Sequence, residues 1–268
     1  MPVNKKIIVF IIFCLVFLVG DVFYEVNFPK LNSITLKSAK IKNGEEVRII
    51  QITDLHSQKF FNLTALFQTI KNSQPDFIVV TGDLIDKKTK DYSYVYGFVD
   101  ELAKLNCPVY FVSGDHEQKN SQNILGELNR HGVEILNNKN IVFEKDGQII
   151  HLYGLDYYNR PVDFDIFKDI PQEDYSILLV HNPYLVINNE NIKMDLILSG
   201  DTHGGQIRLP LVGAIFVPGQ PLFPKYSKGL YQLNNSSLLY IDSGLGYTLT
   251  PIRFFNRSQI SLIKIEGQ

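Results

Sequence analysis

Five short apolar segments of this 268-residue chain each end in a cluster of Asp, His or Gly residues. The segments are rich in β-branched and aromatic residues and are too short for helices, which is the pattern of strands buried on both faces. Strand ends are where an α/β fold gathers polar groups into one crevice. The segments are 48–53, 77–81, 109–113, 177–180 and 196–199, and the clusters after them begin at Asp54, Gly82, Gly114, His181 and Gly200.

The spacing of the first three clusters predicts how the strands are connected. About 30 residues, the length of one strand–helix–strand unit, separate Asp54 from Asp83 and Asp83 from Asp115. The intervening stretches 61–72 and 93–105 have apolar residues at helical spacing. We therefore expect an α/β domain with largely parallel strands and right-handed crossovers.

The residue types in the clusters indicate their chemistry. Asp and His are side chains that bind divalent metal ions in proteins. A single Gly-Asp pair after a strand, such as Gly82-Asp83, is more often a turn than a ligand. Several clusters in register, most of which contain His, favour a shared metal site over a set of turns.

The ordered motifs D-x-H, G-D-x-x-D, G-[ND]-H-E, an isolated His and G-x-x-H resemble the pattern of the calcineurin-like metallophosphoesterase superfamily. The resemblance extends from about Val47 to the C-terminus and implies a four-layer α/β/β/α sandwich with a two-metal site. Three further stretches, 204–210, 243–246 and 251–257, are similar to a bacterial, often membrane-linked branch. Some members of that branch resemble lipid-precursor pyrophosphatases of the UDP-diacylglucosamine type.

The resemblance implies which side chains hold two divalent ions. Mn²⁺ is the expected metal, with Fe²⁺, Mg²⁺ and Zn²⁺ as alternatives. No Ser or Cys nucleophile is needed, because a metal-activated water attacks phosphorus in such sites. The implied ligands are Asp54, His56 and His203 for the first ion, Asp115, His181 and Asp201 for the second, and Asp83 as the bridge between them.

The resemblance also implies a proton donor and contains two departures. His116 is the implied donor to the leaving oxygen, and Asp86 or Glu117 is the implied partner that orients its ring. Asp115 stands where the family usually has Asn, and Asp201 where it usually has His. Both departures fall on the second ion, so the added carboxylates favour Mn²⁺, Mg²⁺ or Fe²⁺ there. We expect that site to be metal-selective or weakly occupied.

The N-terminal segment is typical of a membrane anchor. Residues 7–20 form an unbroken apolar run of about 14 residues, which reaches the ~20 of a span only by continuing past Asp21. No small-x-small cleavage site follows, so we expect an uncleaved single-pass anchor in the cell membrane in preference to a signal peptide. Lys5 and Lys6 before the run predict a catalytic domain outside the cytoplasm. A monotopic enzyme on the inner leaflet is the alternative.

The remaining length predicts one catalytic domain. We expect residues 1–24 to form the anchor, 25–46 a tether and entry to the domain, and 47–268 a single metallophosphoesterase domain. Cys107 is the one cysteine outside the anchor, so no disulfide can form within the domain. A net charge of −2 gives no support to a nucleic-acid partner that needs a broad basic field.

Residues 210–228 form an apolar, proline-rich segment directly after the last metal ligands, and its prolines exclude a regular helix. Such a loop could line a pocket for an acyl chain, dip into the bilayer or pack as core. Arg208, Lys225 and Lys228 are candidates for contact with a phosphate or head group. His151 lies in a strand-like run and is expected to be structural.

The leading interpretation is a membrane-anchored phosphodiesterase, phosphatase or pyrophosphatase whose partners are the membrane and a phosphorylated lipid or lipid-linked substrate. The same hydrolase acting on a soluble substrate such as a nucleotide is one alternative. A non-catalytic metal-binding protein, with Asp115 and Asp201 marking a damaged site, is another. Retention of Asp54, Asp83 and His116 argues against that second alternative.

Overall fold

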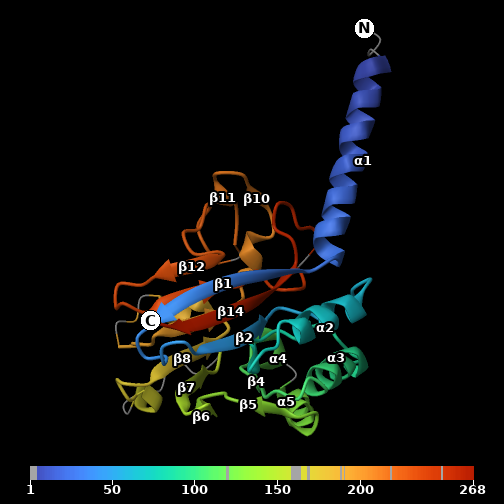
Figure 1. Ribbon diagram of the computed structural model, residues 1–268. Helices are drawn as coiled ribbons and strands as arrows, with labels where there is room; N and C mark the ends of the chain where they lie inside the picture. Colours follow the sequence, from blue (N-terminus) through green and yellow to red (C-terminus); the bar gives the residue numbers. More distant parts are fainter. Residues whose placement is uncertain are drawn as a thin grey trace.

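A computed structural model describes residues 5–118, 121–157, 164–167, 170–187, 189, 191–217, 219–248 and 250–268 (Figure 1). Within these ranges, two six-stranded sheets pack against each other. The first sheet has the order β1 (Lys30–Ser38), β14 (Gln259–Gly267), β2 (Glu46–Ile52), β3 (Phe77–Val80), β4 (Val109–Phe111) and β5 (Val133–Ile135). The second has the order β12 (Gly229–Gln232), β13 (Leu238–Ile241), β9 (Leu196–Ser199), β8 (Tyr175–Val180), β7 (Gln148–Leu155) and β6 (Lys139–Lys145).

The central strands of both sheets run parallel, as the sequence predicts. β2, β3, β4 and β5 are parallel neighbours, and so are β7, β8, β9 and β13. The antiparallel pairs lie toward the edges, with β14 against β2, β12 against β13 and β6 against β7. The carboxyl ends of β2, β3, β4, β8 and β9 carry the five polar clusters, so the clusters come from two sheets that meet at one end.

Alternating side chains of β2 show why the layers form. Ile50 and Ile52 pack with Ile70 and Phe98 of the covering helices, whereas Ile49 packs with Ile177 between the two sheets. This period of two is what a strand buried on both faces produces. The helices over the first sheet are α2 (Leu63–Asn72), α3 (Ser93–Ala103), the short α4 (Asp115–Gln118) and α5 (Ser121–Arg130).

The outer face of the second sheet has a different cover. Val180 and Ile197 pack there against Phe167, Val186 and Met194. These residues belong to or follow the 3₁₀ turns η1 (Phe164–Phe167) and η2 (Pro183–Leu185), and no α-helix covers this face in the part of the chain that is described. The expected α/β fold with two packed sheets between helical layers is confirmed, but in the described residues 3₁₀ turns take the place of α-helices in the fourth layer.

The N-terminal helix α1 (Lys5–Asn27) leaves the domain at one end (Figure 1). It is long and apolar enough to cross a membrane. Its last turn is bonded to the domain, because the Glu25 carboxylate accepts the Asn256 backbone N–H at 2.9 Å and the Glu25 carbonyl accepts that of Ser258 at 2.8 Å. The end of the helix is therefore fixed to the catalytic domain by hydrogen bonds.

The segment expected to be a tether is part of the first sheet. β1 pairs in parallel with β14 along its whole length, from Lys30 opposite Gln259 to Ser38 opposite Gly267. Its polar, partly exposed side chains suit an edge strand, and its partner is more than 200 residues away in the chain. The folded domain therefore begins well before Val47.

Candidate metal centre

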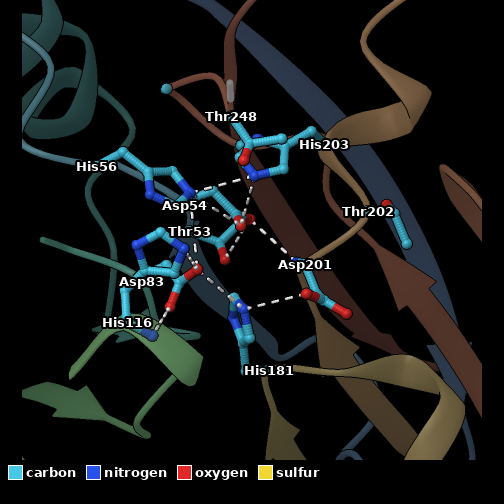
Figure 2. Close-up of polar contacts among 12 residues, drawn as sticks. Thr53, Asp54, His56, Asp83, His116, His181, Asp201, Thr202, His203 and Thr248 are labelled. Carbon is cyan, nitrogen blue, oxygen red and sulfur yellow. Dashed lines mark hydrogen bonds and ion pairs between the residues drawn. The ribbon is translucent and has the colours of Figure 1, made fainter. Parts of the chain in front are cut away.

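The loops that carry the clusters share an unusual backbone. Asp54, His56, Asp83, Asp201 and His203 all have φ between 48° and 70°, in the left-handed region. Non-glycine residues adopt this region rarely, Asp and His among them more readily than most, and such strain concentrates at functional sites. The sharp turns direct these side chains toward one another (Figure 2).

Three of the predicted ligands form a first buried cluster (Figure 2). His56 Nε2 lies 3.1 Å from His203 Nε2, and Asp54 Oδ1 lies 3.4 Å from His203 Nε2 and 3.8 Å from His56 Nε2. Donor atoms that bind one ion through bonds of about 2.0–2.2 Å lie roughly 3–3.6 Å apart. The spacing of this cluster is therefore close to that of a coordination sphere.

Asp83 lies between this cluster and a second one. Its Oδ2 is 3.6 Å from His56 Nε2 and 3.4 Å from His181 Nε2. His181 Nε2 is 3.5 Å from Asp201 Oδ1, and donor atoms of Asp115, His181 and Asp201 lie within 4.8 Å of one another. All seven predicted metal ligands thus converge, with Asp83 placed as a bridge would be.

Two buried atoms of the cluster show that the donor set fits a cation. Asp54 Oδ1 and His181 Nε2 have no hydrogen-bond partner among the described residues, although both lie where the dashed contacts of Figure 2 converge. Buried polar atoms are ordinarily paired, and a divalent ion satisfies carboxylate and imidazole donors together. The Asp and His set therefore suits a dinuclear divalent site.

The electrostatics of the cluster also favour a cation. Burial opposes ionisation, yet the imidazoles of His203, His56 and His181 outweigh it and lower the pKa of Asp54 to about 2. Burial similarly opposes a charged His181, but Asp83 and Asp201 raise the pKa of His181 well above its ordinary value. A divalent ion supplies the positive charge that these carboxylates favour, in place of a proton.

Hydrogen bonds from other loops distinguish His181 from His116. His181 Nδ1 lies 2.7 Å from the Thr81 carbonyl oxygen, which can only accept, so Nδ1 carries the proton and Nε2 presents a lone pair to the cluster. His116 Nδ1 instead accepts the Lys87 backbone N–H at 2.9 Å, so its neutral ring carries the proton on Nε2. That Nε2 faces the predicted metal ligands and lies 3.8 Å from Asp83 Oδ2.

The ring of His116 is thus oriented by a backbone amide, whereas the sequence indicated Asp86 or Glu117. Asp86 Oδ2 lies 3.7 Å from His116 Nδ1, beyond hydrogen-bonding distance. Glu117 accepts the backbone N–H groups of Asp83 and Gly114, each at 2.9 Å, and of Ile85 at 3.3 Å. Burial, with the charge of Asp83 next in importance, raises the pKa of Glu117 to about 7. Glu117 therefore ties together the loops after β3 and β4.

Lys87, which the sequence analysis did not single out, contacts the second cluster. Its Nζ lies 2.5 Å from Asp115 Oδ2. Asp115 is the carboxylate that stands where the family usually has a neutral amide, so Lys87 offsets its additional charge. The signal available in the sequence was the position of Lys87 directly after the G-D-x-x-D motif.

The three predicted substrate cations have partners within the protein. Arg208 donates to the Gly204 carbonyl at 2.8 Å and to Ser227 Oγ at 3.1 Å. Lys228 Nζ donates to Asn256 Oδ1 at 3.2 Å, and burial lowers the pKa of Lys228 to about 7. Lys225 is exposed, with its Nζ 5.0 Å from the Tyr226 ring centroid. Arg208 and Lys228 therefore brace the loops behind the metal cluster.

Two further residues brace the C-terminal loops beside His203. Asn256 Nδ2 donates to the His203 carbonyl at 2.7 Å. The fully buried guanidinium of Arg253 donates to the carbonyl oxygens of Gly246 at 3.0 Å, Asn256 at 3.1 Å and Ser243 at 2.6 Å. The sequence gives no sign that an arginine in a C-terminal loop is buried, because its partners are backbone atoms.

Arg253→Met is expected to lower the free energy of unfolding by about 3 kcal/mol, since it leaves buried carbonyl groups unpaired. Urea unfolding of the full chain in detergent, followed by circular dichroism, measures the change. Arg130→Met is the matched control, because Arg130 pairs with Glu127 on the surface, where such pairs contribute ~0–1 kcal/mol. Equal effects of the two substitutions would contradict the structural role of Arg253.

An apolar cavity borders the metal cluster. Its volume is about 250 Å³, and Ile207, Ile215 and Phe216 line it together with His203 and Thr248. The first three residues belong to or flank the hairpin of β10 (Arg208–Leu209) and β11 (Gly213–Ala214). The segment after the last metal ligands therefore forms one wall of a pocket that reaches a predicted ligand.

Comparison with known families identifies the arrangement. The family model described as calcineurin-like phosphoesterase matches residues 47–205, which contain all the converging Asp and His residues. The chain belongs to the calcineurin-like phosphoesterase family. The superfamily expected from the motifs is thereby confirmed, and the protein is a metallophosphoesterase.

Relatives of this metallophosphoesterase occur in several bacteria. It is 32% identical over 244 residues to the uncharacterized metallophosphoesterase YkuE of Bacillus subtilis, covering 87% of this chain and 84% of the relative. It is 30% identical over 250 residues to the metallophosphoesterase Cj0846 of Campylobacter jejuni, covering 90% of this chain and 64% of the relative. Among solved structures, NAD nucleotidase of Haemophilus influenzae shares the fold, with a TM-score of 0.51 at 18% identity over 77% of this chain and 46% of that one.

Proposed function

We propose that this metallophosphoesterase hydrolyses a phosphoester or pyrophosphate bond in a lipid or lipid-linked substrate at the membrane. The observation that carries the proposal is the apolar cavity of about 250 Å³ that shares His203 with the metal cluster. A phosphoryl group held at the cluster would place the rest of its substrate against Ile207, Ile215 and Phe216. An apolar lining suits an acyl or isoprenoid chain, because burial of its methylene groups is favourable.

The chain's own groups have separate roles in this reaction. Asp54, His56 and His203 would hold one ion, Asp115, His181 and Asp201 the other, and Asp83 both. When bound, such a pair of ions clamps a phosphoryl group and makes hydroxide available near neutral pH. His116 holds a proton on Nε2, on the side of the cluster, where it can protonate a leaving oxygen. Lys87 holds Asp115 in place and limits the net negative charge that an incoming phosphate meets.

Location at the membrane is part of the proposal. Helix α1 would form a single-pass anchor, and the positive charge of Lys5 and Lys6 at its start supports a catalytic domain outside the cytoplasm. Its apolar side chains are exposed along most of its length. A bilayer would cover them, whereas no described part of the domain does.

Competition between lipid and soluble phosphates tests the substrate class. Full-length protein is assayed in detergent with Mn²⁺ and a soluble bis-aryl phosphodiester, in the presence of a diacyl lipid phosphate or of glycerol phosphate. We expect the lipid to inhibit at concentrations at least about tenfold lower, because burying each methylene contributes ~0.8 kcal/mol.

A matched pair of variants localises the effect to the cavity. Ile207→Asp puts a charge on the cavity wall and should remove the preference for lipid, while Val142→Asp on the exposed edge strand β6 should not. Equal inhibition by lipid and glycerol phosphate in the wild type would support a soluble substrate. Absence of turnover in folded, metal-loaded protein would support a binding role.

A further inference from the structure

Exposed apolar side chains gather on the loops that follow the last metal ligands. Ile215 directly follows β11, and its carbonyl accepts the Phe223 N–H at 2.9 Å, so the later part of the loop is held beside the β10–β11 hairpin. Leu211 is completely exposed, and Leu222 is 66% exposed. We name this surface the apolar rim, and it consists of Leu209, Leu211, Val212, Phe216, Leu222 and Phe223.

The backbone of the apolar rim carries strain that no burial offsets. Leu211 has φ 67° and Phe223 has φ 56°, in the left-handed region that bulky apolar residues seldom adopt. Both side chains point away from the core, since neither is buried. Holding large apolar groups outward at a conformational cost indicates a surface built to contact something outside the domain.

The apolar rim lies at the same end of the domain as α1. Figure 1 shows the β10–β11 hairpin rising from that end, on the side along which α1 leaves the domain. The hydrogen bonds from Asn256 and Ser258 to Glu25 fix the end of the helix to the loop that also contacts His203. The apolar rim and α1 thus project from the same end of the domain, and hydrogen bonds through Asn256 connect the end of α1 to the loop of His203.

The junction between α1 and the domain has the composition of a membrane–water interface. Phe23, Tyr24, Phe28 and Phe61 contact one another there, with ring centroids between 5.3 and 6.3 Å apart. The Arg257 guanidinium lies 4.4 Å from the Tyr24 ring centroid. Aromatic rings and neighbouring cations are typical of protein segments that lie at the level of the lipid head groups.

We propose that the apolar rim inserts into the leaflet that α1 enters, so that the catalytic domain is held against the bilayer at two places. Phe216 belongs to both the apolar rim and the cavity beside His203, so the cavity would open toward lipid. A bilayer suits this surface better than a protein partner, because the apolar rim and the exposed length of α1 share one face and direction. The proposal rests on the membrane anchoring in the proposed function and does not depend on the substrate.

A single tryptophan can report the position of the apolar rim, because the chain contains no tryptophan. Leu211→Trp is made in the full-length protein and reconstituted in lipid nanodiscs. Leu211 is completely exposed, so the change should leave hydrolysis of a soluble bis-aryl phosphodiester unaltered. Val142→Trp is the control, since Val142 is 56% exposed on β6, at the end of the domain opposite α1.

We expect brominated phospholipids to quench the Leu211→Trp emission at least twofold and aqueous iodide to quench it little, with the reverse order for Val142→Trp. Iodide quenching of Leu211→Trp as strong as that of Val142→Trp would overturn the proposal. Protection from both quenchers would also overturn it, because a protein surface would then cover the apolar rim. None of these measurements uses a lipid substrate, so failure of the insertion can be distinguished from failure of the proposed substrate class.

Discussion

Asp83→Asn is expected to abolish metal-dependent hydrolysis. The amide has the shape of the carboxylate and tolerates the left-handed backbone at this position, where φ is 55°, so the fold should persist. It removes the negative charge that lies between His56 and His181. Losing a shared ligand forfeits several kcal/mol of transition-state stabilisation, which is on the order of a 10³-fold fall in kcat/KM.

Metal analysis of the purified variant separates this explanation from misfolding. Bound Mn²⁺, Fe²⁺, Mg²⁺ and Zn²⁺ are measured for wild type and variant, and metal content should fall together with activity. Asp76→Asn is the matched control, because Asp76 lies at the opposite end of the same strand and pairs with Lys145 at 2.9 Å. A fully active, metal-loaded Asp83→Asn protein would rule out the bridging assignment.

His116→Ala should lower kcat and leave the bound metal in place. Its Nε2–H lies on the side of the cluster, and removing a positioned proton donor costs roughly 10²–10⁴-fold in rate. The loss should be largest for alkyl leaving groups, which need a proton, and smallest for nitrophenolate, which does not. Steady-state rates over a series of leaving groups, with metal content measured in parallel, check this expectation.

His131→Ala is the matched control variant for His116→Ala. His131 bonds to Asp100 and stacks on Tyr96 away from the cluster, so its removal should leave the rate and its leaving-group dependence unchanged. If His116→Ala slowed every leaving group equally, the side chain would act in binding and not as the acid.

The converging ligands were predictable because their order along the chain is local information. Each follows a strand that is recognisable by itself, and even the isolated His181 stands in its expected place in that order. The contacts that assign protons were not predictable. The Thr81 carbonyl and the Lys87 amide set the roles of His181 and His116, and a backbone atom of a distant loop has no sequence signature.

The segment 210–228 shows another limit of the sequence. Its prolines correctly excluded a helix, but its composition suited a pocket wall, a membrane contact and a core equally well. The structure divides it, since Ala214 and Val217 are buried whereas Leu211 and Leu222 are exposed. Which apolar side chains face inward depends on the hairpin register, with Arg208 opposite Ala214, and composition does not encode that register.

The pairing of β1 with β14 limits where this chain can be shortened. A truncation at Val47, where the recognisable family pattern begins, would delete the edge strand and leave β14 with unpaired amide and carbonyl groups. β14 is largely buried and contains Ile260, Ile263 and Ile265, so the new edge would be a long apolar one. Such an edge recruits other chains, and a fragment cut for solubility there would aggregate.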